Sequence, residues 1–293
     1  MGGAIAAIDY MKSRLVESNA ERINRIEANE TIVVGVNRWQ QGEPSPLTAG
    51  DGGIMVVDPA VEHDQVSRLQ AWRTERDAAA VAAALEQLSA DAKAGRNIMP
   101  ASIAAAKAGA TTGEWAGVMR KVHGEYRGPT GVSRSPSNKT EGLADIRAAV
   151  DAVSSQLGRR LKFLVGKPGL DGHSNGAEQI AFRARDCGMD ITYDGIRLTP
   201  EQIVEKALEE GAHVVGLSIL SGSHIPLIEE LMERMRAAGL GHVPVVVGGI
   251  IPDEDAVKLK GFGVTRVYTP KDFELNRIMM DIVALATPAS AAA

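Results

Sequence analysis

Residues 161–176, LKFLVGKPGLDGHSNG, contain the unit that the C-terminal half of the chain repeats. The unit opens with a short apolar run, Leu161–Val165, which is typical of a buried β-strand. A glycine-rich loop follows, and the chain then continues with helical periodicity from Asn175 to Cys187. Strand, loop and helix in this order predict a βα unit of a parallel sheet.

Five such units follow one another to the C-terminus. The strands are expected at Leu161–Val165, Asp190–Tyr193, His213–Ile219, Val243–Val247 and Thr265–Tyr268. The helices are expected at Asn175–Cys187, Pro200–Glu210, Ile225–Ala238, Asp253–Lys260 and Asp272–Ala286. Strands that alternate with helices across short connections predict an α/β fold, a doubly wound five-stranded parallel sheet of flavodoxin-like order.

The N-terminal part of the chain has a different, mainly helical pattern. Helices are expected at Met1–Ala28, His63–Ala94, Pro100–Ala108 and Thr112–His123. The strand-like run Thr31–Val36 cannot form a sheet alone, so it pairs with the C-terminal sheet or its partners lie outside this chain. The segment Gly128–Gly142 has the composition of a linker and marks the domain boundary.

Composition narrows the functional class. The 293 residues carry 32 Lys and Arg against 37 Asp and Glu, and a net charge of -5 argues against nucleic acid or an anionic membrane as a partner. The single cysteine, Cys187, excludes an intrachain disulfide and a cysteine-rich metal site. There is no signal-peptide pattern and no apolar stretch of bilayer length. We therefore expect a cytoplasmic protein.

The loop after the first strand carries the candidate chemistry. A carboxylate that binds one ring nitrogen of a histidine fixes the tautomer and makes the other nitrogen a better metal donor. Asp171 and His173 have the spacing for this, and Lys167 is placed to pair with Asp171. Taken alone, Asp171 and His173 are more often a helix cap. As a metal site, a single histidine suits a metal whose other ligands come from a macrocycle.

Small and hydroxyl residues at two further strand ends predict a slot beside this loop. They are Ser218 and Leu220 after the third strand and Gly248 and Gly249 after the fourth. With the first loop, they complete the pattern D-x-H-x-x-G, 41 residues, S-x-L, 27 residues, G-G. This pattern resembles the cobalamin-binding domain of adenosylcobalamin-dependent mutases and of methionine synthase.

The resemblance implies a role for each motif residue. His173 would be the lower axial ligand of cobalt, in place of the cofactor's own base. Asp171 and Lys167 would tune the donor strength of the imidazole. The nucleotide tail of the cofactor would lie in a slot lined by Gly176, Ser218, Leu220, Gly248 and Gly249. Roles for Tyr268 and Thr269 stay open, and no catalytic residue is assigned in this chain.

The N-terminal segments resemble the stretch that joins the barrel to the cobalamin domain in the methylmalonyl-CoA mutase family. These segments are Ile32–Arg38, Asn97–Pro100, Thr112–Glu114 and Gly124–Val132, while Met11–Ser18 and Tyr268–Asp272 are more similar to ethylmalonyl-CoA mutases. The resemblance implies three parts: residues 1–132 as the C-terminal edge of a TIM-barrel mutase domain with a helical connector, 133–158 as linker, and 159–293 as the cobalamin-binding domain.

The function implied is that of the adenosylcobalamin-binding portion of an isomerase. Such a mutase rearranges a branched dicarboxylyl-CoA by a radical mechanism, ethylmalonyl-CoA to methylsuccinyl-CoA or methylmalonyl-CoA to succinyl-CoA. Most of the barrel that would bind the acyl-CoA is absent, so we expect this chain alone to be inactive, and to work as a homodimer or with a barrel subunit. Two alternatives remain open: a corrinoid carrier for methyl transfer, and a non-catalytic cobalamin-binding module.

Overall fold

The computed structural model describes residues 2–41, 58–125 and 143–287 and divides the chain into two compact units. One unit comprises Met1–Gly42 with Gly128–Ala293, and the other comprises Glu43–Arg127. Each unit is described by itself.

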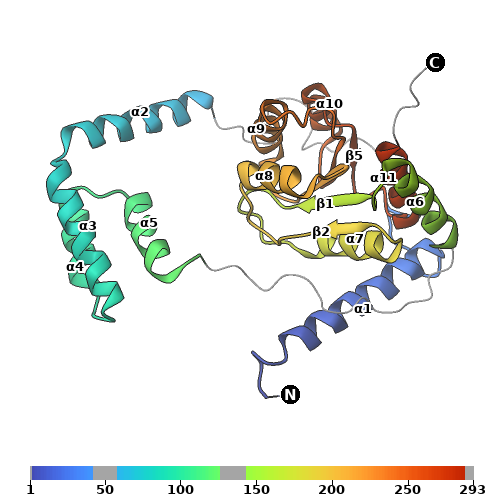
Figure 1. Cartoon of the computed structure of the whole chain (residues 1–293), viewed down its shortest axis with the longest axis horizontal. Coiled ribbons are helices and arrows are strands. Elements are labelled where there is room, and N and C mark those ends of the chain that lie inside the picture. Colours follow the sequence, from blue (N-terminus) through green and yellow to red (C-terminus); the bar gives the residue numbers. More distant parts are fainter. Residues whose placement is uncertain (1, 42–57, 126–142, 288–293) are drawn as a thin grey trace. The chain divides into compact units, whose positions relative to one another are not determined.

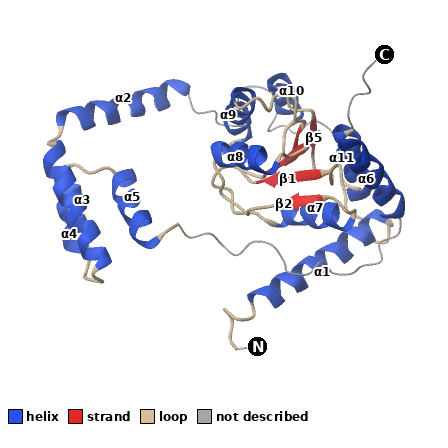
Figure 2. Ribbon diagram, viewed as in Figure 1, coloured by secondary structure: helices blue, strands red, loops and turns tan. Residues whose placement is uncertain are grey.

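A five-stranded parallel sheet forms the centre of the first unit (Figure 2). Its strands are β1 (Lys162–Gly166), β2 (Asp190–Thr192), β3 (Val214–Ile219), β4 (Val245–Gly249) and β5 (Arg266–Tyr268). The strand order is β2-β1-β3-β4-β5, and every neighbouring pair is parallel. The predicted α/β class and flavodoxin-like order are confirmed. One boundary differs, because Gly248 and Gly249 are the last two residues of β4 and not a turn after it.

Helices cover both faces of the sheet. The helices α8 (Pro200–Glu210), α9 (His224–Ala237) and α10 (Asp253–Phe262) pack on one face, and α6 (Leu143–Leu157), α7 (Asn175–Asp186) and α11 (Leu275–Ala286) on the other. Each face has its own hydrophobic core, and successive residues of β3 show the division: Val214 belongs to one core and Val215 to the other. Both faces of the parallel sheet are therefore buried, as such sheets require.

The linker expected over residues 133–158 is wrong in its second half. Residues Leu143–Leu157 form α6, while 133–142 lie outside the described residues. Apolar side chains at Leu143, Ile146, Val150 and Val153 recur at helical spacing and are buried with α11 and the sheet. The helix forms because this stripe gains burial on the sheet domain.

The N-terminal helix α1 (Ile8–Glu27) belongs to the same unit and contacts α7 (Figure 1). The strand expected at Thr31–Val36 is wrong, since these residues make a turn with one isolated bridge between Val34 and Arg38. Asn37 stabilises this turn, because its side chain accepts from Val33 N–H at 2.8 Å and donates to the carbonyl of Thr31 at 2.9 Å. These local hydrogen bonds replace the sheet partner that the run lacks.

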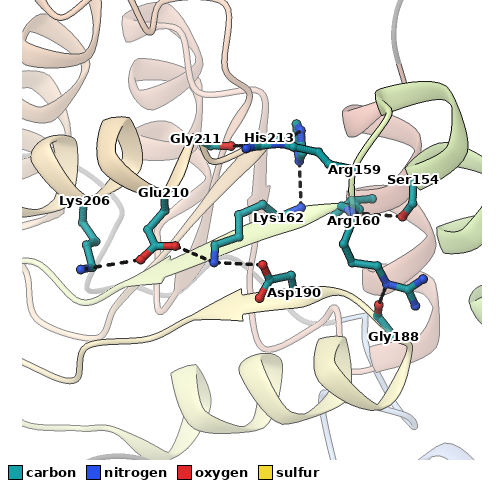
Figure 3. A network of polar contacts seen from close by, with 11 residues as sticks. Ser154, Arg159, Arg160, Lys162, Gly188, Asp190, Lys206, Glu210, Gly211 and His213 are labelled. Carbon is teal, nitrogen blue, oxygen red and sulfur yellow. Dashed lines mark hydrogen bonds and ion pairs between the residues drawn. The ribbon is translucent and has the colours of Figure 1, made fainter.

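A polar network secures the amino end of β1 (Figure 3). The guanidinium groups of Arg159 and Arg160 donate to the carbonyls of Gly211 and Gly188, just past the ends of α8 and α7. The backbone N–H of Lys162 donates to Nδ1 of His213 at 2.8 Å. This network lies at the opposite end of β1 from the loop that carries His173.

The second unit is helical, as predicted. Its helices are α2 (Pro59–Glu75), α3 (Ala78–Lys93), α4 (Met99–Ala108) and α5 (Thr112–His123). The single helix expected at His63–Ala94 is wrong, because the chain breaks between α2 and α3, where Asp77 caps the N-terminus of α3. A bidentate ion pair between Arg76 and Glu114 joins this break to the start of α5.

Candidate functional site

The loop after β1 is held by short backbone pairing with the segment before α8. Leu198 N–H donates to the carbonyl of Lys167 at 3.0 Å, and Gly169 N–H donates to the carbonyl of Leu198 at 3.0 Å. Gly169 has a φ of 79°, in the left-handed region that glycine adopts with least strain. The loop is thereby fixed at the carboxyl end of the sheet, where ligands of open α/β folds bind.

Asp171 is the centre of the site. Its side chain is only 2% exposed. Oδ2 accepts from Lys167 Nζ at 2.8 Å and from Leu220 N–H at 2.9 Å. Oδ1 accepts from His173 N–H at 3.0 Å and lies 2.7 Å from His173 Nδ1. One carboxylate thus joins the loop after β1 to the end of β3, and the predicted contacts of Asp171 with His173 and Lys167 are both present.

The carboxylate is ionised. Burial alone would raise the pKa of Asp171, but hydrogen bonds from the Lys167 ammonium and from the N–H groups of His173 and Leu220 hold that pKa well below its usual range. Lys167 is fully buried and also donates to the carbonyl of Ser218 at 3.2 Å. Lys167 and Asp171 therefore form a buried ion pair beneath the loop.

His173 projects away from this ion pair toward solvent. Its side chain is 77% exposed even though Nδ1 contacts the buried carboxylate. An ionised carboxylate only accepts hydrogen bonds, so in the neutral imidazole Nδ1 carries the proton and Nε2 presents its lone pair. The site therefore displays one imidazole nitrogen of fixed tautomer, which is what a metal ligand requires.

A cavity of about 310 Å³ lies beside this loop. All five residues expected to line a slot do line it: Gly176, Ser218, Leu220, Gly248 and Gly249. Much of the remaining wall is apolar and includes Phe163, Val165, Ile180, Val246 and Ile278. Tyr268 and Thr269 also line the cavity. Such a slot suits a largely apolar group.

Two glycines permit the close packing around the slot. A side chain at Gly249 would collide with the backbone carbonyl of Ile219 in the neighbouring strand. A Cβ at Gly216 would lie 2.6 Å from the ring of Phe163. Gly249 is therefore required by the approach of β3 to β4, and Gly216 by the ring at the base of the slot.

Sequence reasoning missed the deeper wall of the slot. It searched the strand ends, whereas Phe163, Val165 and Val246 project from within β1 and β4. Successive residues of a strand point to opposite faces of the sheet, so the alternation along β1 and β4 identifies the side chains that face the slot. Ile23 of α1 lines the same cavity, and no local pattern points to it.

The described part of the chain contains no cluster of side chains typical of a metal centre. Residues 2–41, 58–125 and 143–287 contain no group of three or more His, Cys, Asp or Glu side chains that could hold a metal ion. Among the helices of the same ranges, none is long and apolar enough to cross a membrane.

Family models match both parts of the chain. Residues 161–271 match the model described as B12 binding domain, and residues 1–125 match the model described as Methylmalonyl-CoA mutase. Cobalamin is the cofactor of the domain family to which residues 161–271 belong. The chain belongs to the methylmalonyl-CoA mutase family and corresponds to its C-terminal, B12-binding part.

Among curated relatives, the chain is more similar to ethylmalonyl-CoA mutases than to a methylmalonyl-CoA mutase. An ethylmalonyl-CoA mutase of Cereibacter sphaeroides is 71% identical over 293 residues, which are 100% of this chain and 45% of that protein. An ethylmalonyl-CoA mutase of Methylorubrum extorquens is 59% identical over 96% of this chain and 41% of its own length. A methylmalonyl-CoA mutase of Cereibacter sphaeroides is 34% identical over 92% of this chain. The chain spans less than half the length of these relatives.

Proposed function

We propose that this chain holds adenosylcobalamin for an acyl-CoA mutase, with His173 as the lower axial ligand of cobalt. The observation that carries the proposal is the exposed imidazole, whose Nδ1 lies 2.7 Å from the buried Asp171 carboxylate and whose Nε2 has no hydrogen bond to any described residue. The residues fit the group, because one nitrogen donor of fixed tautomer stands beside an apolar slot of about 310 Å³.

Lys167 and Asp171 tune His173 through the proton on Nδ1. When a metal draws electron density from Nε2, the Nδ1–H becomes more acidic and its hydrogen bond to a carboxylate strengthens. The Lys167 ammonium keeps Asp171 in the charged form that receives this hydrogen bond. Both side chains are buried, so water does not weaken the arrangement.

The slot would hold the nucleotide tail of the cofactor, displaced from cobalt by His173. Gly176, Ser218, Leu220, Gly248 and Gly249 would line the tail, and Tyr268 and Thr269 stand at the same cavity. The apolar wall favours an aromatic ring because apolar surface leaves water there.

The reaction proposed for the complete enzyme is the isomerisation of ethylmalonyl-CoA to methylsuccinyl-CoA. The chemistry that bound adenosylcobalamin supplies is homolytic cleavage of its cobalt–carbon bond. The 71% identity to an ethylmalonyl-CoA mutase supports this substrate over methylmalonyl-CoA. The acyl-CoA would bind a barrel that lies mostly outside this chain. The chain would act in the cytoplasm, either as part of a homodimer or together with a barrel subunit.

Electron paramagnetic resonance of the chain loaded with cob(II)alamin tests the ligand. In ¹⁵N-labelled protein, ligation by His173 gives doublet superhyperfine splitting, whereas ligation by the cofactor's own unlabelled base leaves a triplet. His173→Ala should lose the doublet, and the control His242→Ala, at an exposed histidine far along the chain, should keep it. A triplet in the unsubstituted protein contradicts the assignment.

Activity then separates the mutase from its alternatives. The chain, combined with a matching barrel subunit and adenosylcobalamin, should isomerise ethylmalonyl-CoA faster than methylmalonyl-CoA. Cofactor binding without turnover of either thioester, together with methylation of bound cob(I)alamin by a methyl donor protein, would instead indicate a corrinoid carrier.

A further inference from the structure

Helix α1 lies against the cobalamin-binding unit, although the mutase model matches residues 1–125. It packs along α7 (Figure 1). Ile26 near its end is buried. Both α7 and α11 flank the slot, since Gly176 and Ile180 of α7 and Ile278 of α11 line it. The helix that precedes the rest of the mutase segment therefore reaches the cofactor slot itself.

Polar contacts fix the position of α1 on these two helices. The carboxylate of Glu27 accepts from the N–H of Leu275, the first residue of α11, at 2.9 Å. Lys12 lies 3.7 Å from Glu178 of α7, whose side chain is 7% exposed. The contacts are spread along the helix, so they set its rotation as well as its distance from the sheet.

Ile23 is the residue of α1 that lines the slot. It precedes Glu27 by one helical turn, so the two side chains lie on the same face of α1. The hydrogen bond from Glu27 to the start of α11 thereby holds Ile23 toward Gly176, Gly248 and the other slot residues. An aliphatic side chain at this position adds to the mainly apolar wall of the slot.

We infer that Ile23 is a binding residue for the aromatic base of the cofactor's nucleotide tail, so that a helix of the mutase segment contributes to cofactor recognition. The inference rests on the proposed function, because it needs the tail to occupy the slot. Ile23 lies outside residues 161–271, which match the B12-binding domain model, so the inference extends the cofactor site beyond that segment.

The test compares two corrinoids that differ only in the tail. Adenosylcobalamin carries the nucleotide tail, and adenosylcobinamide lacks it while offering the same cobalt to His173. Ile23→Ala should raise the Kd for adenosylcobalamin about tenfold, which corresponds to about 1.4 kcal/mol, and leave the Kd for adenosylcobinamide within about twofold. Ile23→Val should act in the same direction with a smaller change, and it preserves folding if the alanine variant does not. Leu15→Ala, at an exposed position of the same helix, is the matched control and should change neither Kd.

The outcomes separate this inference from the proposed function. Equal weakening of both corrinoids by Ile23→Ala and Ile23→Val shows a structural role and overturns the inference, and so does an unchanged Kd for adenosylcobalamin. In either case the doublet splitting from His173 can persist, which leaves the proposed function standing. A triplet in the unsubstituted protein overturns both.

Discussion

Replacement of Lys167 by methionine isolates the buried ion pair beneath the site. Methionine has nearly the volume of lysine without its charge, so the packing changes little while Asp171 loses its cation. Neither partner is exposed, at 0% and 2% of the side chain, so solvent does not screen the pair. Removing one partner of a buried ion pair costs about 3–5 kcal/mol. Asp171 keeps hydrogen bonds from the N–H groups of Leu220 and His173, which places the expected loss near the lower end, about 3 kcal/mol at pH 7.

The stability lost in Lys167→Met should depend on pH. In the unsubstituted protein the pKa of Asp171 is lowered by folding, so its contribution to stability is present above the unfolded pKa and is lost only as pH falls through the folded pKa. In Lys167→Met, burial acts without the opposing cation and raises the pKa of Asp171 in the folded state. Protonation on acidification then relieves the buried charge, and the deficit should shrink by up to about 1.4 kcal/mol per pH unit.

Urea unfolding followed by circular dichroism at pH 7 and pH 4.5 measures the effect. Lys258→Met is the control, because its ion pair with Asp255 is at the surface, with 59% of the lysine side chain exposed, and should cost about 0–1 kcal/mol at either pH. A Lys167→Met loss below about 1 kcal/mol at pH 7, or an equal loss at both pH values, would refute the reasoning about a buried, ionised Asp171.

Four further predictions concern single residues. Gly249→Ala should destabilise the protein by about 3 kcal/mol or more, because its Cβ meets a β3 carbonyl, whereas Gly222→Ala, which has open space, should stay within about 0.5 kcal/mol in the same urea assay. Burial, and secondarily a nearby arginine, lowers the pKa of His213, so stability should fall as pH drops from 7 to 5, and His213→Asn should flatten that slope in thermal melts. Glu27→Ala should cost about 1 kcal/mol by freeing the first N–H of α11, while Glu27→Gln, which retains an acceptor, should cost less by chemical denaturation. Asp171→Asn should abolish the doublet superhyperfine splitting in the cob(II)alamin complex while leaving the fold intact by circular dichroism.

The sheet was predictable because its signals are local. A parallel strand buried on both faces is a continuous apolar run, as in Phe163–Val165, and helices with proline or glycine at their ends mark the intervals. The contacts of Asp171 with Lys167 and His173 were predictable for the same reason, since these residues lie within one short loop.

The missed features have two different causes. Helix α6 did have a local signal, the apolar stripe that includes Ile146 and Val150, but the Gly- and Ser-rich segment before it dominated the interpretation. The docking of α1 has no such signal. Glu27 and the residue it caps, Leu275, are 248 positions apart, and no periodicity within either segment reports their hydrogen bond. Ile23 of the same helix lines the slot, and no local pattern reports this contact either.

The surroundings of Asp171 explain why a carboxylate suits this position. Oδ2 accepts from the Lys167 ammonium and from the N–H of Leu220, and Oδ1 accepts from the N–H of His173 and faces its ring. The ammonium and both backbone groups are donors. An asparagine amide has only one oxygen, and its NH₂ group must point at one of these two sets. Toward Lys167 it meets two donors in a buried space. Toward His173 it donates to Nδ1, which moves the imidazole proton to Nε2 and removes the lone pair that a metal needs. Asp171 therefore does more than stabilise the loop, because a carboxylate accepts at both oxygens and so favours, in the neutral imidazole of His173, the tautomer that carries its proton on Nδ1.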